Sequence, residues 1–203
     1  AVGGLSPEKF EEEIEKCSRL TDKPFGVNLM LMHPQADEIA EIIARHPVAA
    51  VTTGAGNPGK YIPMWKEKGI YVMPVVASVL LADRMVKAGA DAVIAEGTES
   101  GGHVGEMTTL ALVPQMVDAL DVPVIAAGGI ADGRGMAAAY VLGACGVQVG
   151  TCLLASNECP IHDNYKNAVV KAGDNATVVT GRSANAPVRV LKNKMARQYL
   201  LME

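Results

Sequence analysis

The sequence predicts an α/β protein that is built from six strand-plus-helix units in series. Six short apolar runs, rich in β-branched residues, alternate with amphipathic segments along the 203 residues. Successive runs begin roughly 21–30 residues apart, as such units require. The runs show little strict alternation, which is typical of parallel strands buried on both faces. A (β/α)8 barrel and a doubly wound sheet both have this organisation. Since a closed barrel needs eight strands, six runs indicate an open sheet or a barrel that lacks its first strands in this chain.

The individual elements follow from local signals along the chain. Ser6 and Pro7 begin the first helix as an N-cap residue and a first-position proline. Another helix covers Ser78–Ala88 and ends at Gly89, a residue type that terminates helices. Gly135–Leu142 is a helix of small residues that can pack closely against a sheet. The predicted strands are Pro24–Leu31, Ala49–Thr53, Ile70–Val76, Ala92–Ala95, Val122–Ala127 and Val147–Thr151.

The sequence changes character after residue 155. We expect residues 1–155 to form the barrel core that binds a ligand. Residues 156–203 are more polar and contain several basic residues between Arg182 and Arg197. We interpret this second part as a last strand, Ala176–Thr180, with helices outside the core.

Composition and charge argue against several classes of protein. Apolar residues make up 49% and charged residues 20% of the chain, as in ordinary globular proteins. The net charge of −4 makes a nucleic-acid-binding surface unexpected. The uncharged stretch Gly135–Asn157 has the length of a membrane span, but glycines and Gln148 divide it into helix, turn and strand, so we expect no membrane partner. The four cysteines form no CxxC pair, which favours reduced thiols in a cytoplasmic protein and no metal site.

A glycine-rich segment after the fourth strand carries the first candidate site. Active sites of parallel barrels lie at the carboxyl ends of strands. This strand ends at Glu96 and leads to Gly101, Gly102 and His103. Imidazole can act as an acid or a base near neutral pH, so His103 is a candidate catalytic residue. The alternatives are a loop histidine bonded to a nearby carbonyl, and a surface or salt-bridged carboxylate at Glu96.

Two later strands end in glycine-rich turns that suit a phosphate group. Gly128 and Gly129 follow one strand, with a helix beginning near Asp132, and Gly150 and Thr151 end the next strand. Exposed backbone N–H groups at such junctions bind phosphate. We therefore expect the two turns to lie side by side around a phosphate-bearing ligand. The alternative is that these glycines allow tight strand–helix packing.

Two further features have two interpretations each. Asn28 lies in the first strand, where its amide either reaches the polar edge of a ligand or caps a loop. A basic cluster near the end of the chain either forms a solvated face or meets an acidic partner or the phosphate of a pyridine nucleotide. The cluster consists of Arg182, Arg189, Lys192, Lys194 and Arg197.

Taken as a set, these segments resemble the nitronate monooxygenase-like flavoproteins. The resemblance is carried by Thr21–Asn28, Glu99–His103, Ala126–Gly133 and Gln148–Thr151. Within that superfamily, Val51–Pro58 and Ile94–Gly97 are most similar to bacterial FMN-dependent enoyl-[acyl-carrier-protein] reductase II. Nitronate monooxygenases, by contrast, tend to have a glutamine where Glu96 stands.

The resemblance implies a TIM-type (β/α)8 barrel that binds FMN and apparently lacks its first strands here, with a small helical portion in residues 156–203 beside the substrate. It also implies NADH or NADPH as co-substrate, an acyl carrier protein carrying the enoyl thioester as partner, and a homodimer. His103 matches the family's catalytic histidine. The positions that match or adjoin its flavin-contacting places are Asn28, Glu96, Gly101, Gly128, Gly129, Gln148, Val149, Gly150 and Thr151.

Three functions are compatible with these observations. The leading hypothesis is an FMN-dependent oxidoreductase that uses NAD(P)H to reduce the double bond of an enoyl thioester in type II fatty-acid synthesis. His103 would then stabilise or protonate the enolate. The second is nitronate monooxygenase activity, in which alkyl nitronates are oxidised with FMN and oxygen. The third is a catalytically silent barrel that binds a phosphate ligand or a partner.

Overall fold

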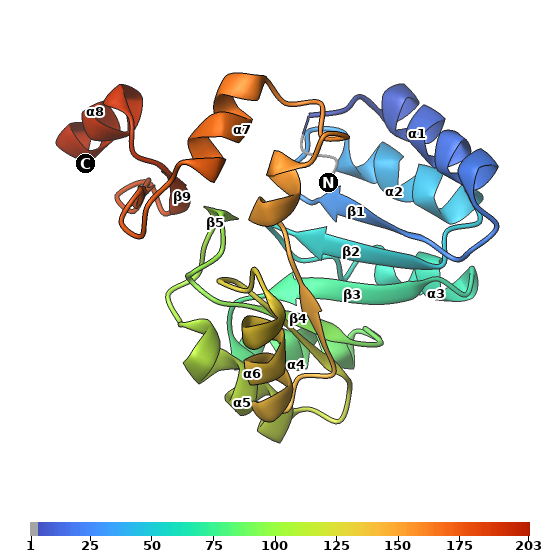
Figure 1. Ribbon diagram of the computed structural model, residues 1–203. Coiled ribbons are helices and arrows are strands. Elements are labelled where there is room, and N and C mark those ends of the chain that lie inside the picture. The colour runs from blue at the N-terminus through green and yellow to red at the C-terminus, as the bar shows by residue number, and fades with distance from the viewer. Residues whose placement is uncertain (1–3) are drawn as a thin grey trace. The chain divides into compact units, whose positions relative to one another are not determined.

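The structure, a computed structural model, describes residues 4–203 (Figure 1). The chain forms two compact units, one comprising the residues up to Ile94 with Ala119–Pro123, and the other Ala95–Asp118 with Val124–Glu203. The strand order of the main sheet is β1-β2-β3-β4-β6-β7, which is the order of the six predicted runs. The α/β class is therefore confirmed. The division between the units falls inside β4 (Val93–Glu96).

The first unit is a set of parallel strands with a helix after each one. Register pairs join Asn28 to Thr52 and Val51 to Val72, with all pairings parallel. Its strands are β1 (Gly26–Met30), β2 (Ala50–Gly54) and β3 (Tyr71–Val76), and its helices are α1 (Pro7–Leu20), α2 (Ala36–Arg45), α3 (Ile62–Glu67) and α4 (Val79–Lys87). The predicted helix signals are confirmed: the Ser6 and Ser78 hydroxyls cap α1 and α4, and Gly89 follows α4 with a φ of 106°.

The core of this unit is built around helix α2. Helix α2 packs on β1 and α1 packs on α2 (Figure 1). Ile39 and Ile43 of α2 are fully buried, as is Trp65 of α3, whose indole N–H donates to Ala40 O at 3.0 Å. This burial fixes the strands, which carry the polar residues Asn28 and Thr52 opposite each other in the middle of β1 and β2.

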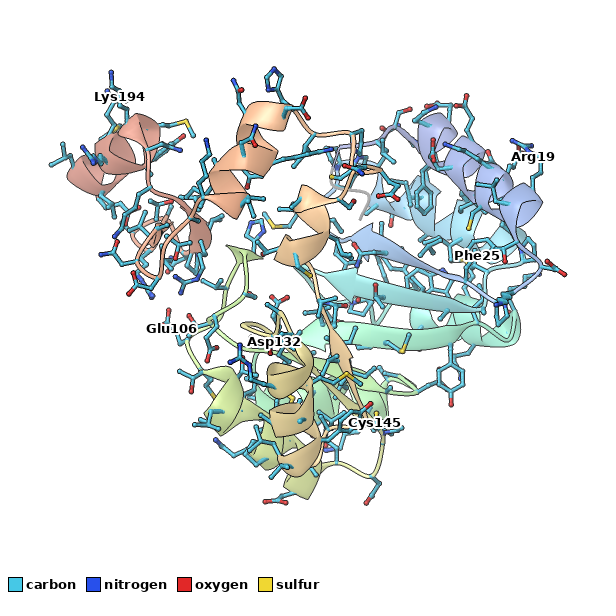
Figure 2. The ribbon with its side chains drawn as sticks, in the orientation of Figure 1. Arg19, Phe25, Glu106, Asp132, Cys145 and Lys194 are labelled. Atoms are coloured by element: carbon cyan, nitrogen blue, oxygen red, sulfur yellow. The ribbon has the colours of Figure 1, made fainter. Side chains whose placement is uncertain are left out.

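The second unit contains parallel strands β6 (Val124–Ala127) and β7 (Gly146–Gln148), with Ala127 opposite Gln148. Helices α5 (Thr109–Ala119) and α6 (Gly133–Val141) precede and follow β6. The Asp132 carboxylate caps α6 by accepting the N–H groups of Arg134 and Gly135 at 2.9 and 3.1 Å. Figure 2 shows Asp132 at the start of this helix.

The strand predicted at Val147–Thr151 ends earlier than expected. Gln148 is its last residue, and Thr151–Ala155 form a 3₁₀ helix, η1. The physical reason is that Gly150 turns the chain out of the sheet, with φ −129° and ψ −69°. Gly150 and Thr151 therefore lie beyond the strand, in the turn that leads to η1.

The interpretation of residues 156–203 as one strand with helices was wrong in one respect. Strand β8 (Thr177–Thr180) is present as predicted, but it pairs antiparallel with a second strand, β9 (Val188–Leu191). Strand β9 also pairs with β5 (Gly102–His103), giving the order β5-β9-β8. The helices of this part are α7 (Asp163–Val170) and α8 (Lys194–Met202). A domain boundary at residue 155 stays a prediction.

Within residues 4–203, no helix combines the length and the apolar character needed to cross a membrane.

Candidate active site

Three glycine-rich loops of the second unit meet at the carboxyl ends of their strands. The N–H of Gly97, just after β4, donates to Ala127 O at the end of β6 at 3.0 Å. Because Ala127 lies opposite Gln148, the turns that begin at Gly128 and Val149 leave neighbouring strands. A Cβ placed on Gly101 would lie 3.1 Å from the Thr151 hydroxyl. The structure thus brings together the predicted residues of this unit that follow β4, β6 and β7.

Two of the glycines are required by packing. Gly128 has a φ of 101°, and a Cβ there would lie 2.9 Å from Gly97 O and from the Thr109 hydroxyl. A Cβ on Gly97 would lie 2.1 Å from the same hydroxyl. Contacts of this length are not tolerated, so the packing interpretation holds for Gly97 and Gly128. Gly129, with a φ of 70°, would place a Cβ 3.1 Å from Cβ of Glu99.

Gly150 differs from these glycines because, apart from Gly150 and its two chain neighbours, no described residue places an atom within 4 Å of where its Cβ would lie. Its φ of −129° does not require glycine. A small residue that neither packing nor φ demands, at the carboxyl end of a parallel strand, fits a backbone that a ligand approaches closely. At the start of α6, the Asp132 carboxylate accepts the N–H groups of Arg134 and Gly135, so these two amides are engaged within the protein. Phosphate binding at the junction after Gly128 and Gly129 stays a prediction.

Glu99 fastens the loop after β4 to the start of α5. Its carboxylate accepts the Thr109 N–H at 2.9 and 3.1 Å and lies 2.9 Å from the Thr109 hydroxyl. That hydroxyl also lies 3.0 Å from Gly128 O, so its proton serves either acceptor. A carboxylate at a helix N-terminus is stabilised by the unpaired N–H groups and the helix dipole. Sequence reasoning missed this clamp, although a threonine before an apolar helix is a signal for a helix start.

Glu96 and Ser100 form a half-buried polar pair beside the loop. Burial raises the pKa of the Glu96 carboxyl, and the neighbouring Ser100 hydroxyl opposes this change by lowering it. The Ser100 side chain is only 8% exposed, and within the described residues its oxygen makes no hydrogen bond of ordinary geometry. Glu96 is therefore neither a surface carboxylate nor part of a salt bridge in the described chain.

His103 lies in strand β5, where backbone pairing holds it. It is opposite Val188 of β9, and the N–H of the next residue, Val104, donates to Pro187 O at 3.1 Å. The imidazole is exposed, so it is accessible to a substrate. Sequence reasoning placed His103 in a loop because a strand of two residues leaves no pattern.

The basic cluster does not form a uniform solvated face. Arg189 is half-buried, and two of its nitrogens donate to Thr98 O. Arg182 forms an ion pair of 2.5 Å with Glu106, a residue that Figure 2 shows in the segment between β5 and α5. The remaining members, Lys192, Lys194 and Arg197, are exposed.

In the first unit, Asn28 is held by its neighbour on the next strand. Its amide nitrogen donates to the Thr52 hydroxyl at 2.9 Å, a bond between paired residues of neighbouring strands and not a loop cap. Thr53 is fully buried, and its hydroxyl has no partner in the described chain. The turn that follows contains Ala55 at a φ of 55°, a strained value for a residue other than glycine. The amide oxygen of Asn28 as a ligand contact stays a prediction.

Other parts of the molecule offer weaker candidates. Two open hollows of the first unit lie around Pro47, near the amino ends of β1 and β2, and no predicted site residue lines them. Among residues 4–203, no group of three or more histidine, cysteine, aspartate or glutamate residues is placed to hold a metal ion.

Comparison with known proteins agrees with this geometry. A model of the family described as nitronate monooxygenase matches residues 39–201. The chain belongs to the nitronate monooxygenase family. A 5-hydroxy-7a-methyl-1-oxo-octahydroindene-4-carboxyl-CoA dehydrogenase of Rhodococcus jostii is 37% identical over 92% of this chain and 53% of its own length. A probable nitronate monooxygenase of Staphylococcus saprophyticus is 34% identical, over 95% of this chain and 68% of its own length.

Solved structures of related proteins are also similar to this chain. FabK from Thermotoga maritima is 52% identical with a TM-score of 0.94, over 97% of this chain and 63% of that one. A nitroalkane oxidase from Streptomyces ansochromogenes is 28% identical with a TM-score of 0.87, over 96% of this chain and 69% of that one. These likenesses confirm the TIM-barrel class. The chain spans 53% to 69% of the length of these four proteins.

The raised pKa of Glu96 predicts a stability that depends on pH. With a folded-state pKa above the unfolded value, the folded protein binds the proton more readily, so its stability falls as pH rises between the two values. Glu96→Gln should therefore raise Tm at pH 7, by about 2–4 °C for each kcal/mol of destabilisation that the buried carboxylate causes and the amide does not. The gain should shrink as pH falls toward the ordinary value of 4.5. Thermal unfolding of the ligand-free protein measures the gain in Tm at pH 7 and its decrease at lower pH. Glu158→Gln, at an exposed position, is the matched control. Equal Tm values for Glu96→Gln and the wild type at pH 7 would contradict the prediction.

Proposed function

We propose that the chain is the FMN-binding part of an enoyl-[acyl-carrier-protein] reductase that uses NAD(P)H. The observation that carries this proposal is the 52% identity and TM-score of 0.94 with FabK, an enoyl-[acyl-carrier-protein] reductase II. The other relatives differ in name, one being a CoA-thioester dehydrogenase and others nitronate monooxygenases. Glu96 supports the reductase, because nitronate monooxygenases tend to have glutamine at this place.

FMN fits the residues of the second unit. We place the phosphate at Gly150, which is exposed and follows the strand next to the one that leads to Gly128 and Gly129, where backbone N–H groups can hold it. Gln148, Val149 and Thr151 continue that edge. Glu96 and Gly101 follow on the neighbouring loop, and Asn28 is the contact proposed from the first unit. When bound, FMN supplies the redox chemistry, receiving hydride from NAD(P)H and delivering it to the β-carbon of the enoyl thioester.

In this proposal, the protein's side chains supply the proton for the enolate and orient the cofactor. His103, exposed and held by β9, is proposed to stabilise the developing enolate or to protonate its α-carbon. Glu96 has its pKa raised by burial, so its carboxyl retains a proton more readily than a surface carboxylate does. We propose that this carboxyl faces a polar edge of the cofactor.

The partners of the reaction are part of this proposal. We propose an acyl carrier protein as the carrier of the enoyl thioester, because Lys194 and Arg197 are exposed at α8 and basic residues favour encounter with an acidic protein. A homodimer is proposed on the family resemblance. Nitronate oxidation is the second candidate function, supported by the family model and the staphylococcal relatives.

The first prediction distinguishes these two reactions. The FMN-loaded protein should consume NADH or NADPH without oxygen when given a crotonyl thioester, and should transform it faster as the acyl-carrier-protein thioester than as the CoA thioester. Under air, a propyl nitronate should cause little oxygen uptake. Oxygen uptake with the nitronate and no anaerobic consumption of either nucleotide would reverse the assignment.

A second prediction tests the phosphate site. Gly150→Ala places a methyl group where no described protein atom lies within 4 Å, so the fold should persist. If a phosphate occupies that space, the Kd for FMN should rise about tenfold or more, which corresponds to roughly 1.4 kcal/mol. Flavin fluorescence on titration measures the Kd, and Gly173→Ala, also in open space, is the matched control. Unchanged FMN binding by Gly150→Ala would remove Gly150 from the site.

A third prediction concerns His103. His103→Ala should leave FMN bound and the reduction of the flavin by NAD(P)H intact, since hydride arrival needs no proton from this residue. The half-reaction with the enoyl thioester should slow by roughly 10²–10⁴-fold, the usual range for losing an acid–base group. Stopped-flow absorbance follows each half-reaction, with His162→Asn as control because it keeps a cap acceptor at α7. Equal slowing of both would indicate that His103 positions the flavin instead.

A further inference from the structure

We infer that Arg189 is a positioning residue that holds the loop carrying His103 in its productive place. This inference rests on the proposed function for its kinetic part, and on the geometry of the second unit for the rest. Arg189 Nε and Nη2 donate to Thr98 O at 3.2 and 2.9 Å. Its third nitrogen, Nη1, donates to the Thr177 hydroxyl of β8 at 3.0 Å.

Arg189 contacts the loop at both of its ends. Its guanidinium binds the backbone at Thr98, and its own backbone lies opposite Gly102 in the pairing of β5 with β9. The N–H of Thr98 is bonded in addition to Met107 O at 2.7 Å. Arg189 therefore contacts both ends of the loop formed by residues 98–102, Thr98 through its side chain and Gly102 through its backbone.

Within the loop, Glu99 is fastened to Thr109, but the two glycines that lie between Glu99 and His103 leave the last part of the loop without a side-chain restraint of its own. Gly101 and Gly102 are exposed, and Gly102 has a φ of 82° with no described atom within 4 Å of the place of its Cβ. Glycine has more conformational freedom than any other residue. The contact of Arg189 with Thr98 O therefore adds to the Glu99–Thr109 clamp and ties the start of the loop to β9, the strand that pairs with His103.

The chemistry of the contact is specific to arginine. Two parallel N–H groups reach one carbonyl while a third reaches Thr177, a fork that the single ammonium of lysine does not reproduce. With three nitrogens engaged, the guanidinium is a backbone clamp, and the earlier alternative of a pyridine-nucleotide phosphate contact is less favoured. Arg182 of the same segment, which pairs with Glu106, makes no such bond to the loop within the described residues.

The first experiment measures the loop without any activity. Amide hydrogen exchange of the ligand-free protein should be at least about fivefold faster in residues 98–104 of Arg189→Lys than in the wild type, while β8 keeps its protection. Thr177→Val, which removes one acceptor and leaves Arg189 in place, should show a smaller increase. Arg182→Gln is the matched control and should leave these residues unchanged. Equal exchange in wild type and both clamp variants would overturn the inference.

The second experiment measures the kinetic consequence. In Arg189→Lys, FMN content and flavin reduction by NAD(P)H should be unchanged, whereas the half-reaction with the enoyl thioester should slow about 10–100-fold, with kcat lowered and KM nearly constant. If Arg189 acts through His103, the double variant with His103→Ala should be no slower than His103→Ala alone. Additive losses would contradict positioning. If His103→Ala itself has no effect, the proposed role of His103 fails, and the hydrogen-exchange result still decides the inference.

Discussion

The candidate site depends on a steric constraint, the close approach of the chain at Gly97 and Gly128. A side chain on Gly97 would collide with the Thr109 hydroxyl. A side chain on Gly128 would collide with the Gly97 carbonyl oxygen and with the same hydroxyl. Because both lack one, the loop after β4 can pass against the turn after β6, and the Gly97 N–H can bond to Ala127. The helix start at Thr109 is drawn into the same contact and receives the Glu99 carboxylate. The backbone thus sets the form of the site before any catalytic side chain is placed.

Much of this architecture could be predicted from local signals. The six strands of the main sheet were found within a few residues of their ends, because buried parallel strands are typically continuous apolar runs that can be recognised locally. Helix α6 was found because Asp132 and the small residues after it form a local cap and face. The end of β7 was placed too late because Val149 and Thr151 favour strands, while Gly150 turns the chain away.

The parts that sequence reasoning missed depend on contacts between distant residues. Strand β5 has two residues, which is too short for any periodicity, and it exists only because β9 lies beside it. The partner of Arg189 is Thr98, 91 residues earlier in the chain, so the arginine was interpreted with its basic neighbours as part of a solvated face. Glu99 and Thr109 are ten residues apart, but their pairing requires the loop to return to the helix start, which no local pattern indicates.

In the proposed site, the backbone forms the binding turns and a few side chains set the reaction, which explains why proteins with different names share this fold. FabK at 52% identity and the nitroalkane oxidase at 28% both superpose on almost the whole chain. A site made of glycine turns and backbone N–H groups places few demands on side chains, so it persists while the sequence diverges. The choice of reaction must then lie in the few side chains that face the strand ends. For this chain we propose the half-buried Glu96 and the exposed His103 as two such side chains, which differ in exposure and in the groups that hold them. Differences among relatives at such positions, more than overall identity, are therefore where their activities should separate.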